Sequence, residues 1–343
     1  MKVFNGLTEK RLNEILDKMK DVKAVLLGDM CLDMYWSCDM TKSVLSRETP
    51  HFPLPVTEER MAPGAGGNAL NNMATLSENV SAIGVIGDDW RGMCLKKCFS
   101  DRGIDTKYIV ENGGRVTNAY CKPMRRGYLG FEVEDPRIDF ESFSKIDEST
   151  EEILIQNLRE AVKGADVLCI SDQFDFGCVT DRVRDEVNEI AKNILTVVDS
   201  RSRISLYRNA FLKPNEIECA RALNVESEKL VSGEDNSELL KSFSEKTNSD
   251  VCMTLGAKGV EIYKNGKIIK SGGVKVDPPI DTCGAGDCFL SAFSLSLGAG
   301  ATEEEAAAMG NLASAICVKK VNTTGSASRE EIINLFMSVA ENG

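Results

Sequence analysis

The chain has 343 residues, with 53 Asp and Glu residues against 41 Lys and Arg residues and a formal net charge of -12. This excess of negative charge argues against nucleic acid or an anionic membrane as the main partner. No apolar stretch approaches the roughly 18 residues needed to cross a bilayer, and the N-terminal residues lack the apolar core of a signal peptide, so we expect a cytoplasmic protein.

Short apolar runs alternate with amphipathic segments along the chain. The runs predict buried strands at 22–29, 80–86, 166–170, 194–198, 210–212 and 251–255, and the segments predict helices at 9–20, 151–162, 180–192 and 303–318. Strands that alternate with helices are joined by crossover connections, which favour parallel pairing. The order therefore predicts an α/β fold with a mostly parallel sheet and helices on both faces.

Two stretches, at about 35–61 and 113–131, break this alternation. They lack helical periodicity and contain alternating or aromatic residues with prolines. We expect antiparallel strands outside the main sheet, which together form one small lid on a single domain spanning residues 1–343. Such a lid would keep water away from a reaction centre.

A first glycine-rich turn, Pro63-Gly-Ala-Gly-Gly-Asn-Ala-Leu-Asn-Asn-Met-Ala-Thr75, leads into a helix. It does not match a dinucleotide-binding fingerprint, because no apolar strand precedes it and the third glycine is missing. Glycines at a helix start with Asn68 and Asn72 suit a ligand with several hydroxyl groups, since an amide both donates and accepts. The alternative is that Asn68 only caps the helix.

Two further turns follow predicted strands. In Lys213-Pro-Asn-Glu-Ile-Glu218, Asn215 and Glu218 lie three residues apart at a helix start, so the pair could hold a hydrated Mg²⁺ near a phosphate. Glu216 points elsewhere, towards solvent. In the alternative, this pair only starts a helix. The second turn, Thr254-Leu-Gly-Ala-Lys-Gly259, suits contact with a nucleotide through its glycines and threonine.

The segment Asp281-Thr-Cys-Gly-Ala-Gly-Asp287 is a glycine-rich turn that runs into an apolar helix, and it is the most informative part of the chain. Its small residues, 284–286, let a phosphate approach backbone N–H groups at a helix N-terminus, which favours an anion. Asp287 would repel a polyphosphate unless it acts chemically, and we expect it to take the proton of an attacking hydroxyl group. The alternative is an ordinary helix cap.

The 12 cysteines are scattered, mostly in apolar segments, without a CxxC pair, and His51 is the only histidine. We therefore expect no structural zinc site, and buried free thiols in a reducing compartment are the most economical interpretation. Cys283 and Cys288 flank the second glycine-rich turn, but we expect no redox role for them. His51 lies in a Pro-rich stretch typical of an extended surface segment, which argues against a Ser-His or Cys-His pair.

These motifs resemble those of the PfkB or ribokinase-like carbohydrate kinases. Residues 64–72 resemble the N-terminal signature, residues 281–287 the C-terminal signature, and Asn215 to Glu218 the NxxE motif of that family, in the correct order. The chain is similar to the family from about residue 22 to its end. It resembles in particular the heptose-7-phosphate kinase domain of bacterial ADP-heptose synthesis, in Gly28-Asp29, Leu32-Asp-Met-Tyr-Trp36, Arg137-Ile-Asp-Phe-Glu141, Ser171-Asp172, Val198-Asp-Ser-Arg201, Tyr207-Arg208 and Pro214-Asn215.

The resemblance implies a ribokinase-like fold, with a Rossmann-like sheet and a small β lid. It also implies ATP and Mg²⁺ as cofactors. Members of the family are often dimers, and we expect a homodimer whose interface is formed by the lid. Asp287 would be the base, and Gly284, Ala285 and Gly286 the anion hole. The implied substrate ligands are Asp33, Gly64, Asn68 and Asn72. Asn311 beside the adenine would join the nucleotide contacts expected at Asn215, Thr254, Gly256 and Gly259. Glu218 would serve Mg²⁺, and Asp281 with the carbonyls near Gly325 would resemble a site for a monovalent cation such as K⁺.

The chain departs from the family pattern at two positions. Ala65 stands where the usual signature has a second glycine, and Arg201 stands where the heptose kinases have the Lys of Asp-Pro-Lys. Kinase activity is compatible with both changes, and the identity of the sugar stays open.

The sequence therefore predicts an ATP-dependent kinase whose partner is a small-molecule sugar or sugar phosphate. One alternative is a nucleoside kinase of the same fold, with a base beside the lid aromatics Tyr35 and Trp36. Packing of these rings within the lid is the simpler interpretation. The other alternative is a non-catalytic sugar sensor, which the intact Asp287 and anion hole disfavour.

Cationic residues are concentrated at two places on this acidic chain. Arg201 and Arg203 follow the strand predicted at 194–198, and Lys122, Arg125 and Arg126 lie in the predicted lid. Arginine grips phosphate through two parallel hydrogen bonds, so these residues, with Arg201 foremost, would clamp a phosphate that the substrate already carries. The alternative is that they pair with surface carboxylates.

Overall fold

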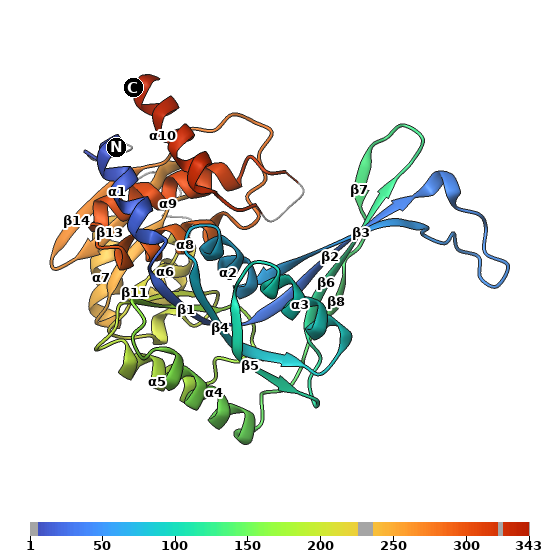
Figure 1. Cartoon of the computed structure of the whole chain (residues 1–343), viewed down its shortest axis with the longest axis horizontal. Coiled ribbons are helices and arrows are strands. Elements are labelled where there is room, and N and C mark those ends of the chain that lie inside the picture. Colours follow the sequence, from blue (N-terminus) through green and yellow to red (C-terminus); the bar gives the residue numbers. More distant parts are fainter. Residues whose placement is uncertain (1–5, 226–235, 322–324, 343) are drawn as a thin grey trace.

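The computed structural model describes residues 6–225, 236–321 and 325–342 (Figure 1). Within these ranges, nine strands form one sheet in the order β14-β13-β12-β11-β10-β9-β1-β4-β5. The neighbouring strands from β12 to β5 are parallel, and β13 and β14 add an antiparallel hairpin at one edge. The strands are β1 (Lys23–Gly28), β4 (Asn79–Gly87), β5 (Asp105–Asn112), β9 (Val167–Asp172), β10 (Thr196–Ser200), β11 (Phe211–Leu212), β12 (Asp250–Thr254), β13 (Gly259–Lys264) and β14 (Lys267–Gly272).

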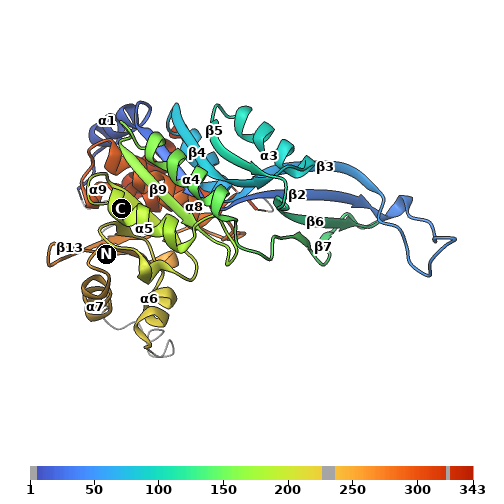
Figure 2. The same cartoon turned by 90° about the horizontal axis from the view of Figure 1, so that it is seen from below.

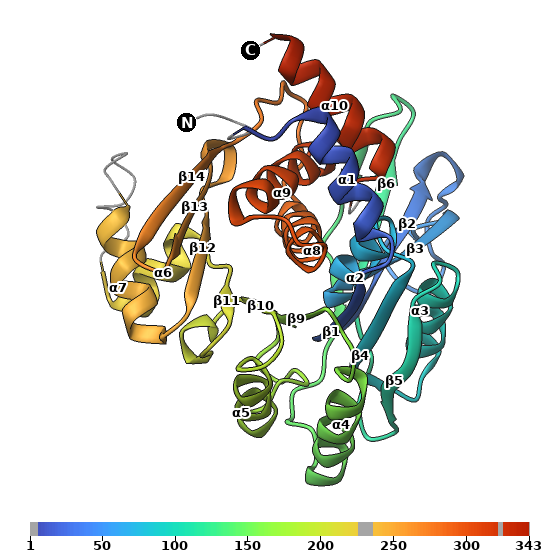
Figure 3. The ribbon, with the colours of Figure 1, turned by 60° about the vertical axis from the view of Figure 1, so that its left-hand side comes forward.

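Helices cover both faces of this sheet, as Figure 3 shows. One face carries α1 (Glu9–Met19), α2 (Gly66–Ala74), α8 (Ala285–Gly298), α9 (Glu303–Cys317) and α10 (Arg329–Asn342), and the other carries α4 (Glu148–Ala161), α5 (Asp181–Ile190), α6 (Glu216–Leu223) and α7 (Ser237–Thr247). Strand β1 shows why both faces are covered. Ala24 and Leu26 pack into the first apolar core, and Val25 and Leu27 into the second. The predicted α/β fold is confirmed.

Side-chain caps fix where several helices begin. Thr8, Asp89, Asp147, Thr180 and Thr302 each accept a backbone N–H of the first turn of α1, α3 (Trp90–Ser100), α4, α5 and α9 respectively. These hydrogen bonds satisfy donors that have no partner within the helix. The predicted helix and strand positions agree with the structure to within a few residues. The sequence analysis did not find the helices α3, α7 and α10 or the strands β5, β7, β8, β13 and β14.

A second sheet forms the lid, in the order β3-β2-β6-β7 with β8 also paired to β6. Its strands are β2 (Met30–Asp39), β3 (Val56–Ala65), β6 (Asn118–Arg126), β7 (Glu132–Glu134) and β8 (Ile138–Phe140). The expectation of purely antiparallel pairing is wrong, because β2 and β6 run parallel. Strand β2 follows β1 after a single residue, so the lid is anchored directly at the carboxyl edge of the main sheet.

The β2–β3 hairpin extends away from the main sheet as an arm that Figures 1 and 2 show in profile. The short 3-10 helix Met40–Lys42 and an irregular segment, which contains His51, connect its strands. Strand β3 runs straight into α2, so the strand before the first glycine-rich turn belongs to the lid and, as expected, is not apolar. It is an exposed lid strand whose outer half is polar, which is why apolar patterning did not reveal it.

No helix within the described residues is both long and apolar enough to cross a membrane.

Candidate active site

The candidate site lies where the carboxyl ends of the parallel strands meet the lid. Asp29 follows β1, Asp172 ends β9, Asp199 is the last residue but one of β10, and Lys213 follows β11. Strand order reverses on either side of β1, and ligands of open α/β sheets bind at the carboxyl edge near such a reversal.

The two glycine-rich turns meet at this edge. Asn68 in α2 donates from Nδ2 to Oδ2 of Asp287 in α8 over 2.7 Å. Both helix-capping alternatives are wrong, since α2 is capped by Ala65 without a side-chain bond and α8 by Gly284. Gly284 has a positive φ of 78°, and a Cβ there would lie 2.8 Å from Asn68 Nδ2. Only glycine permits this approach.

Ala65 occupies a backbone conformation that side chains disfavour. Its φ of 49° and ψ of -130° lie in a region that glycine enters easily. The departure from the family signature at this position therefore has a local cost of order 1–3 kcal/mol, which the surrounding structure offsets.

The surroundings of Asp287 raise the pKa of its carboxyl group. Burial raises the pKa of this carboxyl to about 7, against the favourable hydrogen bond from Asn68. The negative charges of Asp199 and Asp33 raise it further, and the ammonium group of Lys213 lowers it. A carboxyl with a pKa near neutrality can accept a proton and release it at the pH of the cell.

Lys213 is a site residue to which the sequence analysis gave no role. Its side chain is almost fully buried, and Nζ lies 3.1 Å from Asp199 Oδ2. Burial alone would lower the pKa of Lys213, but the carboxylates of Asp199, Glu218 and Asp287 raise it above its ordinary value. A Cβ on Gly286 would lie 3.7 Å from Nζ, so the ammonium group borders the second glycine-rich turn. Its position in the sequence, between the end of a predicted strand and the NxxE motif, could have identified Lys213 as a site residue.

Asn215 and Glu218 form a reciprocal capping box at the start of α6. Asn215 Oδ1 accepts the N–H of Glu218 over 2.8 Å, and Glu218 Oε2 accepts the N–H of Asn215 over 2.9 Å. Burial raises the pKa of Glu218, and Asp199 adds to the effect. No group of three or more His, Cys, Asp or Glu residues within the described ranges could hold a metal ion. A hard cation here would therefore draw most of its oxygen ligands from water and phosphate, as Mg²⁺ commonly does.

A cavity of about 400 Å³ brings together the residues predicted to contact a nucleotide, except Asn215, which does not line it. It is lined by Thr254, Gly256, Gly259, Ala285, Gly286 and Asn311, with apolar walls that include Val276, Ile280 and Phe289. Asn311 donates to Ser271 Oγ over 3.2 Å and to the Gly272 carbonyl over 3.0 Å. Its amide thus joins α9 to β14 at the wall of the cavity.

The lid contributes a buried polar pair. Asp33 in β2 lies 3.5 Å from Lys122 Nζ in β6, and the same ammonium group donates to Tyr35 Oη over 3.1 Å. A Cβ at Gly64 would lie 2.8 Å from Asp33 Oδ1, so glycine makes room for this carboxylate. Lys122 is therefore paired within the lid. Burial raises the pKa of Asp33 while Lys122 lowers it.

The lid aromatics are already covered. The Tyr35 ring lies 3.9 Å from the guanidinium carbon of Arg60 and 4.6 Å from Lys122 Nζ, and Trp36 Nε1 donates to Glu59 Oε2 over 2.7 Å. Packing within the lid, the simpler of the two interpretations, is what the structure shows.

Arg201 lines a second cavity, of about 500 Å³, between the lid and the sheet edge. Its walls come from β6, from residues 141–143, from the loop after β9, from the loop after β10 and from α6, and they include Asn118, Tyr120, Gln173, Phe174, Arg201 and Arg221. Three other predicted phosphate ligands, Lys122, Arg125 and Arg203, are engaged with carboxylates. Arg203 forms an ion pair with Asp172, and Arg125 pairs with Asp135 at 2.9 Å.

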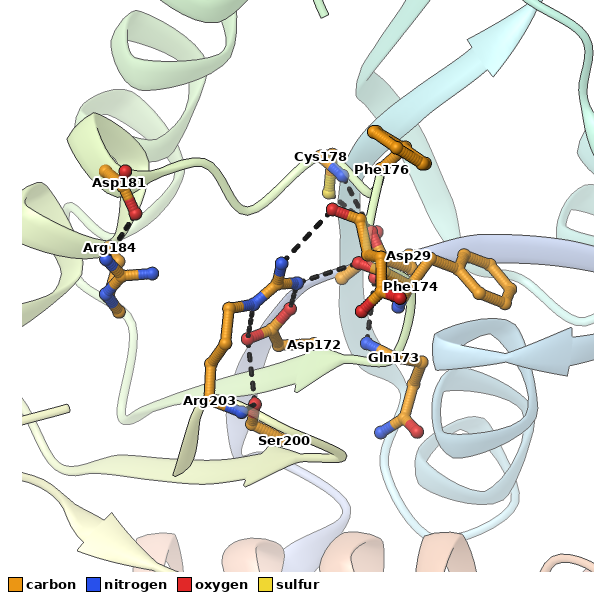
Figure 4. A network of polar contacts seen from close by, with 12 residues as sticks. Asp29, Asp172, Gln173, Phe174, Phe176, Cys178, Asp181, Arg184, Ser200 and Arg203 are labelled. Atoms are coloured by element: carbon orange, nitrogen blue, oxygen red, sulfur yellow. Dashed lines mark hydrogen bonds and ion pairs between the residues drawn. The ribbon is translucent and has the colours of Figure 1, made fainter. Parts of the chain in front are cut away.

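A buried polar network shapes the loop that walls this second cavity (Figure 4). Asp29 accepts the backbone N–H groups of Gln173, Phe174 and Cys178 at 2.7–2.8 Å. Asp172 in turn accepts hydrogen bonds from Arg203, Ser200 and Tyr207, and Arg203 also donates to the Phe174 carbonyl. Buried charges need such partners, so the network fixes the loop while satisfying both carboxylates.

The predicted monovalent-cation site is only partly formed. Asp281 Oδ1 accepts the N–H of Cys283 over 2.9 Å at the start of the glycine-rich turn. The Gly325 carbonyl, however, accepts from Cys288, Cys317 and Asn72 at 3.3–3.5 Å, which directs it into the protein instead. Residues 322–324, which carry other carbonyls near Gly325, lie outside the described ranges.

Known proteins share this architecture. The family model for pfkB family carbohydrate kinases matches residues 24–330. A bifunctional protein HldE from Trichlorobacter lovleyi is 29% identical over 93% of this chain and 64% of its own length, so the chain spans less than two thirds of that relative. Phosphofructokinase-2 from Escherichia coli in complex with fructose-6-phosphate matches with a TM-score of 0.72 at 19% identity, over 93% of this chain and 99% of that one. Its complex with potassium matches with a TM-score of 0.71 at 19% identity, over the same shares.

Proposed function

The chain belongs to the pfkB family of carbohydrate kinases, and we propose that it transfers the terminal phosphoryl group of ATP to a hydroxyl group of a sugar or sugar phosphate. The observation that carries the proposal is the carboxyl of Asp287, held against Asn68 at the N-terminus of α8 with its pKa raised to about 7. In its ionised form this group takes the proton of the attacking hydroxyl. The alternative of a non-catalytic sensor gives no reason to retain such a carboxyl beside an anion site.

The second glycine-rich turn supports the placement of the transferred phosphate. Gly284, Ala285 and Gly286 begin α8, where backbone N–H groups without helical partners favour an anion. The buried ammonium group of Lys213 borders the same turn and adds positive charge. The cavity lined by Thr254, Gly256 and Gly259 adjoins this turn and would take the nucleoside part of ATP.

Oxygen ligands for cations lie beside this turn. Glu218 and Asn215 would hold the water shell of Mg²⁺, which when bound offsets the charge of the phosphates. Asp281 would contribute to a site for a monovalent cation such as K⁺, in line with the potassium complex of the E. coli enzyme. A resident cation would lower the repulsion between the phosphates and the acidic residues around Asp287.

The acceptor would lie under the lid. Asp33, Asn68 and Asn72 are buried amide and carboxylate groups that suit sugar hydroxyls, and Gly64 leaves room for Asp33. A nucleoside acceptor is less well supported, because the Tyr35 ring is covered by Arg60 and Lys122. Turnover of a panel of sugars, sugar phosphates and nucleosides, read as ADP release, separates these acceptors.

Asp287→Asn keeps the size of the side chain and removes the base, so kcat should fall about 10²- to 10⁴-fold. The Kd for ATP should change little, because the carboxylate serves the acceptor. The wild-type kcat should rise with pH and level off above about pH 7, since the ionised form is the active one and the pKa is about 7. Asp185→Asn, an exposed carboxylate on α5, is the control. Near-normal turnover of the Asp287 variant excludes this mechanism.

Glu218→Gln keeps the length of the side chain and an oxygen for the N–H of Asn215, but it removes the charge. The Mg²⁺ concentration for half-maximal rate should rise several-fold, while KM for the sugar stays within about two-fold. Glu216→Gln is the matched control for Glu218→Gln. An unchanged Mg²⁺ titration means that Glu218 serves only the capping box.

Replacing Na⁺ with K⁺ in the same assay should raise the rate of the wild-type enzyme but not that of Asp281→Asn.

We further propose that the acceptor already carries a phosphate, which Arg201 would bind. Arg201 and Arg221 face the second cavity, and the relative crystallised with fructose-6-phosphate shares the fold. Arg201→Ala should raise KM for a phosphorylated sugar at least about ten-fold, since a hydrogen-bonded charge contributes about 1.5–3 kcal/mol, and should leave KM for ATP unchanged. Arg159→Ala, on the outer surface of α4, is the control. More efficient turnover of an unphosphorylated sugar or a nucleoside contradicts this assignment.

The lid arm supports a homodimer as the assembly. Large apolar side chains gather on the segment between β2 and β3 and on the β6–β7 connection, and Val44, Leu45, Phe52, Tyr128, Leu129 and Phe131 are all exposed. Apolar surface of this kind favours a partner surface. Light scattering should give twice the mass of one chain for the wild-type protein. The double variant Phe52→Asp with Leu129→Asp should have the mass of a single chain. Met93→Asp, an exposed apolar residue on α3, should stay dimeric. A monomeric wild type refutes the dimer.

A further inference from the structure

Asn68 is itself held by a chain of buried polar groups. Asn72 Nδ2 donates to the carbonyl of Asn68 over 2.9 Å and to Asn68 Oδ1 over 3.3 Å. The thiol of Cys288 then donates to Asn72 Oδ1 over 2.8 Å. All three side chains are at most 2% exposed, so no solvent can replace a lost partner.

Backbone carbonyls fix the direction of this chain. The nitrogen of the Asn72 amide points to the carbonyls of Asn68 and Gly325, at 2.9 Å and 3.4 Å, and a carbonyl can only accept. Its oxygen must therefore face Cys288, whose thiol is the donor there. Asn68 Oδ1 receives the N–H of Asn72, which leaves Asn68 Nδ2 to point at Asp287.

We propose that Asn72 and Cys288 are positioning residues, which keep the Asn68 amide oriented with its N–H groups towards the Asp287 carboxylate. This inference rests on the proposed role of Asp287 as base. Were Asn72 to turn over, its oxygen would face Asn68 Oδ1, and Asn68 would turn in response. An amide oxygen would then face the carboxylate, and the repulsion would favour the protonated form of the base.

The hydrogen-bonded chain of Asn68, Asn72 and Cys288, which we call the relay, is not the only influence on Asp287, because other charged and titratable groups also face this carboxyl. They are Asp33 on β2, Asp199 on β10, Lys213 after β11, Cys283 in the glycine-rich turn and Cys317 on α9. Within the described residues, none of these side chains forms a hydrogen bond with the side chain of Asn68 or Asn72. A change at Cys288 therefore tests the relay while leaving Asp33, Asp199, Lys213 and Cys283 in place, whereas the Cys317 thiol loses its contact with Cys288.

The test compares Cys288→Ala and Cys288→Val, which lack a donor, with Cys288→Ser, which retains one. The first two should move the midpoint of the kcat–pH profile upwards by about one unit. A shift of that size leaves about a tenth of the base ionised at pH 7 instead of about half, an approximately five-fold loss of kcat that disappears at high pH. Cys288→Ser should keep the wild-type midpoint. Cys169→Ala, a buried thiol in β9, controls for the loss of core volume.

A second readout needs no turnover. The ¹³C signal of the Asp287 carboxyl, assigned by its loss in Asp287→Asn, should show the same upward shift in the variants without a donor. If Asp287→Asn keeps near-normal turnover, the proposed base is wrong. If that variant is inactive while Cys288→Ala and Cys288→Val keep the wild-type midpoint, only the relay is wrong. An equal shift in Cys288→Ser or in Cys169→Ala would also overturn it. Thermal melting identifies any variant that fails to fold, and the remaining donor-free variant then decides.

Discussion

The hydrogen bond from Asn68 to Asp287 joins two helix starts that lie 219 residues apart in the sequence, and the rest of the site is arranged around it. Helices α2 and α8 pack on the same face of the sheet, and both begin at the edge where the parallel strands end. Small residues at 64–67 and 284–286 let the two turns approach, because a side chain at Gly284 would collide with Asn68. The same turns free backbone N–H groups for an anion.

Charge pairing explains how an acidic chain can hold a phosphate donor. Three carboxylates at this edge have a basic partner: Asp33 has Lys122, Asp172 has Arg203, and Asp199 has Lys213. Asp287 has an amide partner instead, and burial raises the pKa of its carboxyl to about 7 although the hydrogen bond from Asn68 opposes this rise. The site thus combines carboxylates that are paired with a basic side chain and one, Asp287, whose hydrogen-bond partner is an amide. Their environments, not their chemical type, separate these roles.

Burial explains why some strands were predicted from the sequence and others were missed. Strand β1 was predicted because both of its faces are buried and its sequence is a continuous apolar run. Strands β5 and β14 were missed because they are largely half-buried or exposed and carry charged residues. The lid segments were found as breaks in the pattern, but the parallel pairing of β2 with β6 was not. Strand direction depends on how the chain returns to the sheet, which local patterning does not record.

By itself, the sequence determined the fold class, the family and the positions of the turns that carry the site. Glycine, proline and helix-starting residues impose backbone conformations within a few residues of themselves, so their spacing can be recognised without a structure. Only the tertiary structure decided which basic side chains form ion pairs with carboxylates. It assigned Arg203 to Asp172 and Lys122 to Asp33, turned the Gly325 carbonyl towards thiols, and placed Lys213 beside Gly286. The reason is that hydrogen bonding and desolvation depend on distance in space, and these partners are brought together by strands and helices far apart along the chain.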